Sequence, residues 1–264
     1  MSPWQAVAWV WLASALAMVL AWLVQRRTRN ATSVDAVWAG SLALAALFYG
    51  AVAPGDGRVR LLVAVLGALW GFRLCLHVLA RALHEAEDGR YAYLRRHWRG
   101  DQRLFFVFYQ GQALLVALFS LAFLAPAWNP GPANWPWLAA AVAMWLLALV
   151  GETIADRQLV RWRSRSEHRG RTLRTGLWRY SRHPNYFFEW LHWFAYLPLA
   201  IGSPLFSLAL LAPALMFVSL NWVTGIPFTE AQAVRSRGDD YRRYQQQTSR
   251  FFPWFPARVS QEDR

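Results

Sequence analysis

The stretch WPWLAAAVAMWLLALVGETIA, residues 135–155, decides the class of fold. It has no charged residue before Glu152, and it matches the run of about 20 apolar residues that a helix needs to cross a bilayer. Six further stretches have the same character: 3–24, 34–53, 61–80, 104–127, 184–202 and 205–226. The chain is 56% hydrophobic and 16% charged. We therefore expect an all-α fold, a polytopic integral membrane bundle of about seven transmembrane helices that forms a single domain over residues 1–264.

The distribution of arginines predicts how this bundle is oriented. All 28 basic residues are arginine. If seven spans are assumed, one side of the membrane collects three, six, nine and seven of them, 25 in all, from the stretches 25–33, 81–103, 156–183 and 227–264. The other side holds only Arg58 and Arg60, and Arg73 lies within a span. Because basic loops stay in the cytoplasm, we expect the N-terminus outside and the C-terminus inside.

The bulk composition also limits the choice of partners. The net charge of +13 would suggest nucleic acid for a soluble protein, but topology and anionic lipid headgroups account for it here, so we expect no nucleic-acid partner. The single Cys75 excludes an intramolecular disulfide. The first span has no basic segment before it, and Arg26 and Arg27 follow it, so we interpret it as a retained helix rather than a signal peptide.

Polar residues near the predicted spans concentrate at their cytoplasmic ends. These residues are Asp35, Arg73, His77, Glu152, Asp156, Asn185, Glu189 and Glu230. Ionisable groups within spans are rare, and they usually face the bundle interior or a water-filled cavity. The concentration favours a cavity open to the cytoplasm over side chains that extend separately to the membrane surface.

The segment GLWRYSRHPNYFFEW, residues 176–190, contains a predicted helix start. Pro184 disfavours a helical conformation at His183 and suits a first helical turn, so the helix should begin there. The free N–H groups and the dipole of that turn would lie close to Arg179 and Arg182. This combination is typical of an anion-binding site.

Helical spacing aligns the polar residues on either side of this start. Asn185, Glu189 and His192 follow one another at i, i+4 and i+7, which places them on one stripe. Glu152 and Asp156 are four residues apart and share a face. The spacing does not match the His-x-x-x-His or Glu-x-x-His patterns of helical zinc and di-iron sites, so we expect no metal. No serine or cysteine has a general base beside it in the sequence, which argues against nucleophilic catalysis.

Two predicted cytoplasmic loops have alternative interpretations. The loop 84–102 is either a solvated connector or a source of a phenol donor, with Tyr91 the first candidate. The loop 156–183 holds nine arginines, which suit either a phosphorylated cofactor or anionic lipid.

Several motifs together resemble a known family. They are ETIADRQL (152–159), the segment 176–190, TGIPFTE (224–230), TSVDAVWAG (32–40), WGFRL (70–74), EDGRYAYLR (87–95) and DDYRRYQQQTSRFFPWFP (239–256). The resemblance is to the bacterial family grouped with the C-terminal domain of steroid 5α-reductase (3-oxo-5-alpha-steroid 4-dehydrogenase), long labelled a domain of unknown function. It covers about residues 33–256 and implies a steroid 5α-reductase-like membrane domain.

The resemblance also implies a cofactor site. The wider superfamily joins NADPH-dependent reductases and S-adenosylmethionine-dependent isoprenylcysteine methyltransferases. Combined with the charge pattern, it gives these candidate cofactor-binding residues: Glu152, Asp156, Arg157, Arg179, Tyr180, Arg182, His183, Asn185, Glu189, Glu230, Tyr241 and Tyr244. NADPH is the expected cofactor, because the many arginines suit its phosphates better than they suit S-adenosylmethionine.

Two departures from the family pattern concern the cofactor slot and the substrate. Phe188 stands where the family usually has glycine before Glu189, which would narrow the cofactor slot. The second span lacks the Gln-Glu pair that steroid 5α-reductases place at the substrate carbonyl, and Asp35 is its nearest substitute. The resemblance therefore implies reduction of a lipophilic enone without specifying a steroid, with Tyr91 and Asp35 as candidate catalytic residues.

The expected activity is reduction of a carbon–carbon double bond in a substrate that enters from the bilayer. The protein would lie in the inner membrane of a bacterium, among membrane lipids, with its active site facing the cytoplasm. The alternatives are an S-adenosylmethionine-dependent methyltransferase and a lipid-binding protein without enzymatic activity.

Reporter fusions after Arg29, Gly131 and Arg264 test the orientation. The arginine distribution predicts that these fusions report cytoplasm, exterior and cytoplasm, respectively. The measurement pairs a reporter that is active only outside with one that fluoresces only inside. A C-terminal fusion that reports the exterior would contradict both the topology and the cytoplasmic site.

Overall fold

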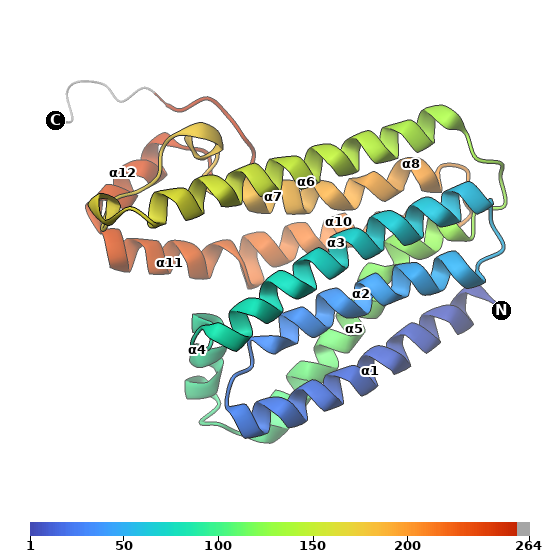
Figure 1. Cartoon of the computed structure of the whole chain (residues 1–264), viewed down its shortest axis with the longest axis horizontal. Helices are drawn as coiled ribbons and strands as arrows, with labels where there is room; N and C mark the ends of the chain where they lie inside the picture. Colours follow the sequence, from blue (N-terminus) through green and yellow to red (C-terminus); the bar gives the residue numbers. More distant parts are fainter. Residues whose placement is uncertain (258–264) are drawn as a thin grey trace. The chain divides into compact units, whose positions relative to one another are not determined.

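The computed structural model describes residues 1–257, and these residues form helices and connecting loops with no strand among them. The predicted all-α class is therefore confirmed. The chain divides into two compact units (Figure 1). Unit 1 comprises residues 1–142 and 195–212, and unit 2 comprises residues 143–194 and 213–257 of the described chain.

Six helical segments are long and apolar enough to cross a membrane. They are α1 (Pro3–Thr28), α2 (Ser33–Val52), α3 (Gly57–His84), α5 (Gln102–Ala127), α6 (Trp135–Arg163) and the segment Phe206–Arg237. Each coincides with one of the predicted spans. The orientation of these helices in a membrane stays a prediction.

The remaining predicted span, 184–202, is divided into shorter pieces. It consists of α7 (Pro184–His192), the 3-10 turn η3 (Trp193–Tyr196) and α8 (Leu197–Ala200). Pro198 has no N–H to donate to the carbonyl of Phe194, so a regular helical ladder cannot continue through this point. The structure thus gives six helical segments of spanning length and composition where about seven were expected, and residues 184–202 form shorter helical pieces.

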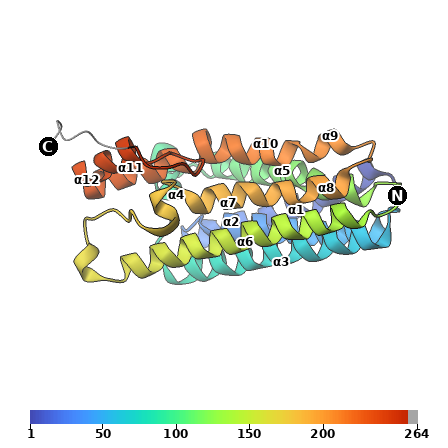
Figure 2. The ribbon, with the colours of Figure 1, turned by 90° about the horizontal axis from the view of Figure 1, so that it is seen from above.

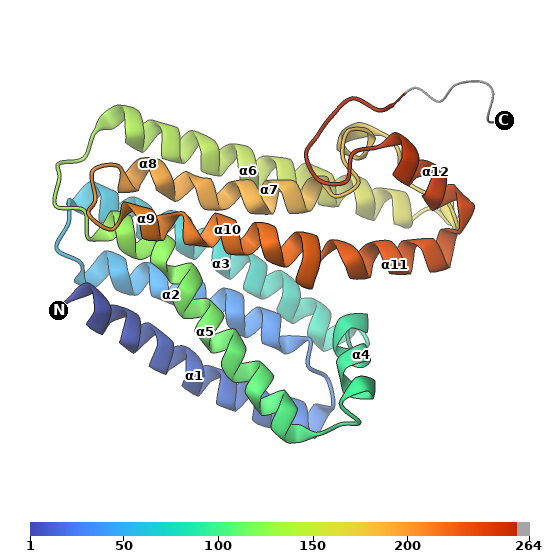
Figure 3. The same cartoon turned by 180° about the vertical axis from the view of Figure 1, so that it is seen from behind.

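Unit 1 is built on α1, α2, α3 and α5, and α5 runs obliquely across α1 and α2 (Figure 3). The short helix α4 (Gly89–His97) follows α3, and α8 and α9 (Phe206–Ala209) pack against α5. Aspartates begin three of these helices. Each accepts a hydrogen bond from the backbone N–H two residues later: Asp56 before α3, Asp88 before α4 and Asp101 before α5.

Small residues let α2 and α3 approach closely. A Cβ atom added to Gly67 would lie 2.4 Å from the Cβ of Ala46, and one added to Gly71 would lie 2.8 Å from the carbonyl oxygen of Ala39. Helices in a membrane associate through such close packing, because lipid tails are as apolar as their side chains.

Unit 2 contains the rest of α6, the 3-10 turns η1 (Ser166–His168) and η2 (Gly176–Arg179), and α7, which lies alongside α6 (Figures 1 and 2). It continues with most of α10 (Leu211–Val218), a π-helical turn η4 (Ser219–Val223), α11 (Ile226–Arg237) and α12 (Asp239–Gln247). The π-helical turn and Gly225 interrupt the helix where the seventh span was predicted to end. Such interruptions are frequent at functional sites.

Two glycine substitutions test the close packing within unit 1. Gly71→Ala should lower the free energy of unfolding by about 1–3 kcal/mol, because its methyl group would collide with the backbone of α2. Gly111 lies in α5 with no atom within 4 Å of an added Cβ, so Gly111→Ala should raise stability by about 0.5–1 kcal/mol. Unfolding in detergent measures both. Equal stability of Gly71→Ala and the wild type would contradict the close contact.

Candidate functional site

All the predicted cofactor-binding residues lie in unit 2, around the start of α7. Three lie on α6, Glu230 lies on α11, and the two tail tyrosines lie on α12. Helix α7 begins at Pro184, as predicted, and His183 is its N-cap residue with φ −138° and ψ 58°. The side chain of His183 does not cap the helix, and its ring points to α11 instead.

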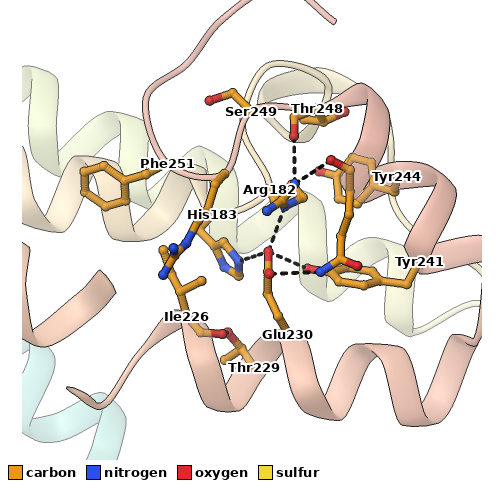
Figure 4. Close-up of polar contacts among 12 residues, drawn as sticks. Arg182, His183, Ile226, Thr229, Glu230, Tyr241, Tyr244, Thr248, Ser249 and Phe251 are labelled. Atoms are coloured by element: carbon orange, nitrogen blue, oxygen red, sulfur yellow. Dashed lines mark hydrogen bonds and ion pairs between the residues drawn. The ribbon is translucent and has the colours of Figure 1, made fainter. Parts of the chain in front are cut away.

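The carboxylate of Glu230 is the centre of this region (Figure 4). One of its oxygens accepts hydrogen bonds from Arg182 Nε at 2.7 Å, His183 Nε2 at 3.2 Å and the Tyr241 hydroxyl at 3.4 Å. The other accepts from Gln245 Nε2 at 2.9 Å. Because an ionised carboxylate only accepts, the His183 proton is on Nε2 in this arrangement.

Arg182 ties the start of α7 to the end of α12. Its Nη1 donates to the carbonyls of Gln245 at 2.7 Å and Thr248 at 3.0 Å (Figure 4). The Tyr244 hydroxyl donates to the carbonyl of Trp178 at 2.5 Å and to that of Ser181 at 3.2 Å. These contacts give Arg182 and Tyr244 structural roles, and their predicted contacts with a cofactor stay predictions.

A second polar link joins α6 to α7. Asn185 Nδ2 donates to Asp156 Oδ1 at 3.1 Å, and both side chains are half-buried. On the same two helices, a Cβ atom added to Gly151 would lie 2.4 Å from the ring of Phe188. The large residue at 188 therefore occupies space that the glycine at 151 leaves open. Phe188 fills the interface between α6 and α7 at this level, and its effect on a cofactor slot stays a prediction.

The other predicted residues on these helices differ in exposure. Glu152 is buried at 8% exposure, Glu189 is half-buried on α7, and His192 is buried at 2%. Arg157, Arg179 and Tyr180 are exposed, and the Arg179 guanidinium lies 6.0 Å from the centre of the Tyr180 ring.

Burial sets the protonation of the titratable groups around Glu230. It lowers the pKa of His183 despite the opposing effect of Glu230, and Arg182 and Arg250 lower it further. Burial also raises the pKa of Tyr241 and Tyr244. Near pH 7 the imidazole is therefore neutral, and both phenols keep their protons.

Most arginines of the long loop remain at the surface. Seven of the nine between 156 and 183 are exposed: Arg157, Arg161, Arg163, Arg165, Arg169, Arg171 and Arg179. Arg174 is held by Asp240, whose Oδ1 accepts from its Nη2 at 2.9 Å, and Arg182 is held by Glu230. The loop thus presents a basic surface fixed at two points.

The two predicted catalytic residues lie in unit 1 and contact each other. The Tyr91 hydroxyl donates to Asp35 Oδ1 at 2.6 Å, and Arg90 Nη2 donates to Asp35 Oδ2 at 3.0 Å. Burial and the charge of Asp35 raise the pKa of Tyr91, so its phenol stays protonated. In this arrangement the pair fastens α4 to the first turn of α2. A role in proton donation stays a prediction.

Several polar residues of these networks were not predicted. In unit 1, Arg95 Nη2 donates to Glu87 Oε1 at 2.7 Å, and this oxygen also accepts from the Ala31 N–H at 2.8 Å. In unit 2, Gln158 Oε1 accepts from the Leu177 N–H at 3.0 Å, beside Gly176 with its φ of 63°. One sequence signal was available for Gln245, because it lies four residues after Tyr241 on α12 and so shares its face.

Comparison with known proteins assigns the chain to a family. It belongs to the family described as "Protein of unknown function (DUF1295)", whose model matches residues 21–248. An uncharacterised protein of the yeast Schizosaccharomyces pombe (strain 972) is 28% identical over 275 residues, which span 88% of this chain and 75% of that protein. No solved structure matches the chain. The similar protein is fungal, so the expected bacterial origin stays a prediction.

The neutral state of His183 predicts how stability depends on pH. Below about pH 6.5 a histidine in the unfolded chain is protonated, whereas the lowered pKa keeps His183 neutral in the folded protein. The unfolded state then binds more protons, so stability falls as the pH drops from about 6.5 toward the folded pKa, by at most about 1.4 kcal/mol per pH unit. His183→Gln should flatten this part of the profile, measured by thermal unfolding in detergent between pH 7.5 and 5.5.

His97→Gln is the matched control for this measurement. His97 is exposed on α4 and stacks on Tyr93, so its removal should leave the pH profile unchanged. A profile equally steep in His183→Gln and the wild type would show that other groups cause the loss of stability in acid.

Proposed function

We propose that this protein is a membrane-embedded, NADPH-dependent reductase of a carbon–carbon double bond in a lipophilic substrate. One observation carries the proposal most directly: the hydrogen-bonded pair of Asp156 and Asn185 lies at the start of α7, in the same unit as seven exposed arginines. The motifs that resemble the steroid 5α-reductase superfamily include both features. This resemblance supports the choice of chemistry.

The residues present fit the chemical groups of a dinucleotide. A carboxylate accepts hydrogen bonds from hydroxyls, and a side-chain amide both donates and accepts, so Asp156 and Asn185 suit a ribose or a carboxamide. Exposed guanidinium groups such as those of Arg157, Arg161 and Arg179 suit phosphates, which they bind with paired hydrogen bonds. The first turn of α7, which includes Asn185, adds N–H groups and a positive dipole end.

The protein's own part in the reaction would be to bind, orient and polarise. Bound NADPH would supply the hydride. Glu230 would hold His183 and Arg182, and with them the first turn of α7, in one orientation. Tyr91 would polarise a substrate carbonyl only after it exchanged its hydrogen bond with Asp35 for one with the substrate.

The apolar helices favour the hypothesis that the substrate is lipophilic. A reductase of a water-soluble compound has no physical need for six helices of membrane-spanning length and composition. We infer that the substrate enters sideways from the bilayer, and that the reductase acts at the inner membrane of a bacterium with its cofactor site facing the cytoplasm. The arginine-rich loops are the basis for that orientation.

Cofactor titration tests the proposal. The full-length protein in detergent is titrated with NADPH, NADH and S-adenosylmethionine at low and high salt, and binding is followed by fluorescence or calorimetry. NADPH should bind more tightly than NADH by about 1.5–3 kcal/mol for each arginine on the 2′-phosphate, or roughly 10- to 150-fold. Salt should reduce this preference, because it screens partly exposed charges.

Two variants test whether NADPH binds at a specific site or only to a basic surface. Asn185→Ala should weaken NADPH binding by about 1–3 kcal/mol, or roughly five- to 150-fold, because it removes the half-buried amide that pairs with Asp156 and would hydrogen-bond the cofactor. Asn134→Ala, at an exposed position before α6, is the matched control and should bind as the wild type does. Binding of S-adenosylmethionine alone would indicate the methyltransferase, and binding of no cofactor would favour a lipid-binding protein.

A further inference from the structure

Three large aromatic side chains near the end of the described chain are exposed. In the segment 249–257, which we call the C-terminal strap, the exposed fractions are 51% for Phe252, 72% for Trp254 and 76% for Phe255. Aromatic side chains of this size normally contribute to cores or interfaces. Side chains that are adjacent and exposed in this way indicate a surface that meets another phase or another molecule.

The strap is held in place by hydrogen bonds within unit 2. The N–H of Arg182 donates to the carbonyl of Ser249 at 2.8 Å, and the Ser181 hydroxyl donates to that of Phe251 at 2.9 Å. The N–H of Trp254 donates to the carbonyl of Tyr180 at 2.8 Å. These contacts fix the strap to the segment that precedes α7. The exposed rings are therefore displayed from a fixed backbone.

The strap continues the aromatic surface of two apolar helices. The ring of Phe252 lies 5.6 Å from that of Trp190 on α7 and 5.9 Å from that of Phe217 on α10. Trp222, in the π-helical turn, is 60% exposed and lies 5.5 Å from Phe217. The exposed aromatics thus extend, through direct contacts, from residues of the predicted spans to the strap.

Positive charge accompanies these rings. Residues 249–257 include no acidic residue, and their one arginine, Arg250, donates a hydrogen bond to the carbonyl of Asn221. The ring of Phe255 lies 5.9 Å from that of Tyr180, whose centre is 6.0 Å from the guanidinium of the exposed Arg179. Arg242 and Arg243 are exposed on the preceding helix. Tryptophan and phenylalanine beside arginine form the composition that binds the interface of a bilayer, where the rings enter the headgroup region and the cations meet anionic lipids.

We propose that the C-terminal strap is a membrane-interface anchor, in which Trp254 and Phe255 insert among the headgroups of an anionic bilayer and the exposed Arg179 binds the lipid phosphates. The bilayer is the same one that the apolar helices cross. The strap contacts side chains of α7 and α10, which belong to predicted membrane spans. This continuity favours the bilayer over a soluble partner protein, which would bind a surface apart from the spans. This proposal does not depend on the proposed reductase activity.

The single native cysteine makes a depth measurement possible. Trp254→Cys in a Cys75→Ser background carries an environment-sensitive fluorophore, and the full-length protein is placed in nanodiscs of phosphatidylcholine with or without phosphatidylglycerol. Nitroxide quenchers are attached either to the lipid headgroup or deep in the acyl chain. Phe255→Cys is labelled in parallel, so the test survives if one variant fails to fold.

Two positions in unit 2 calibrate the depth. Arg165, whose side chain is 67% exposed in the arginine loop, should report water, and Leu147, 58% exposed within the apolar part of α6, should report hydrocarbon. At residues 254 and 255 the headgroup nitroxide should quench several-fold more strongly than the deep one. The emission should shift to the blue when phosphatidylglycerol is added, and salt should partly reverse that shift.

Three outcomes would overturn the proposal. A label that reports water at both positions, as at residue 165, would show that the strap does not touch the bilayer. Stronger quenching by the deep nitroxide would place the strap in the hydrocarbon rather than at the interface. Emission that changes with the number of protein copies per nanodisc, but not with lipid composition, would assign the surface to a second copy of the chain.

Discussion

A half-buried carboxylate with four donors around it holds three segments of unit 2 together. Glu230 on α11 receives hydrogen bonds from the residues that precede α7 and from α12. A carboxylate withdrawn from water is costly unless several donors compensate it, and removing one partner leaves the others unsatisfied. The position of the first turn of α7 therefore depends on Glu230, 47 residues after His183 in the chain. The candidate site, which includes this turn, depends on Glu230 in the same way.

The packing of α6 against α7 shows a compensation between two positions. Phe188 carries a large ring where its helix faces Gly151, and the glycine leaves the space that the ring occupies. Asn185, about one turn earlier on α7, meets Asp156 of α6 by a hydrogen bond. Because one interface contains both contacts, the size of residue 188 constrains the separation of residues 156 and 185. Substitutions at 151 and 188 are therefore expected to be coupled.

Sequence patterns predicted what depends on local chemistry. Six of the seven predicted apolar spans correspond to helical segments of spanning length, and α7 begins at Pro184 as predicted, because both features depend on residues that are local in the sequence. The interruption at residues 193–196 was missed because its apolar residues look like those of a continuous span. The pairing of Arg182 with Glu230 could not be predicted from the sequence, because each charged residue has many possible partners at a separation of 48 residues. Asp35 was expected to face a substrate, yet its contacts with Arg90 and Tyr91 depend on how α4 folds back.

The composition of unit 2 from two separated chain segments has a consequence for biosynthesis. A membrane protein is synthesised from its N-terminus and inserted as it emerges, so residues 143–194 leave the ribosome before residues 213–257 exist. Until α11 and α12 are made, Arg182 and His183 lack Glu230, and the carbonyl of Asn221 lacks the Arg250 side chain that donates to it. The hydrogen bonds that fix the start of α7 can therefore form only after α11 and α12 have been synthesised.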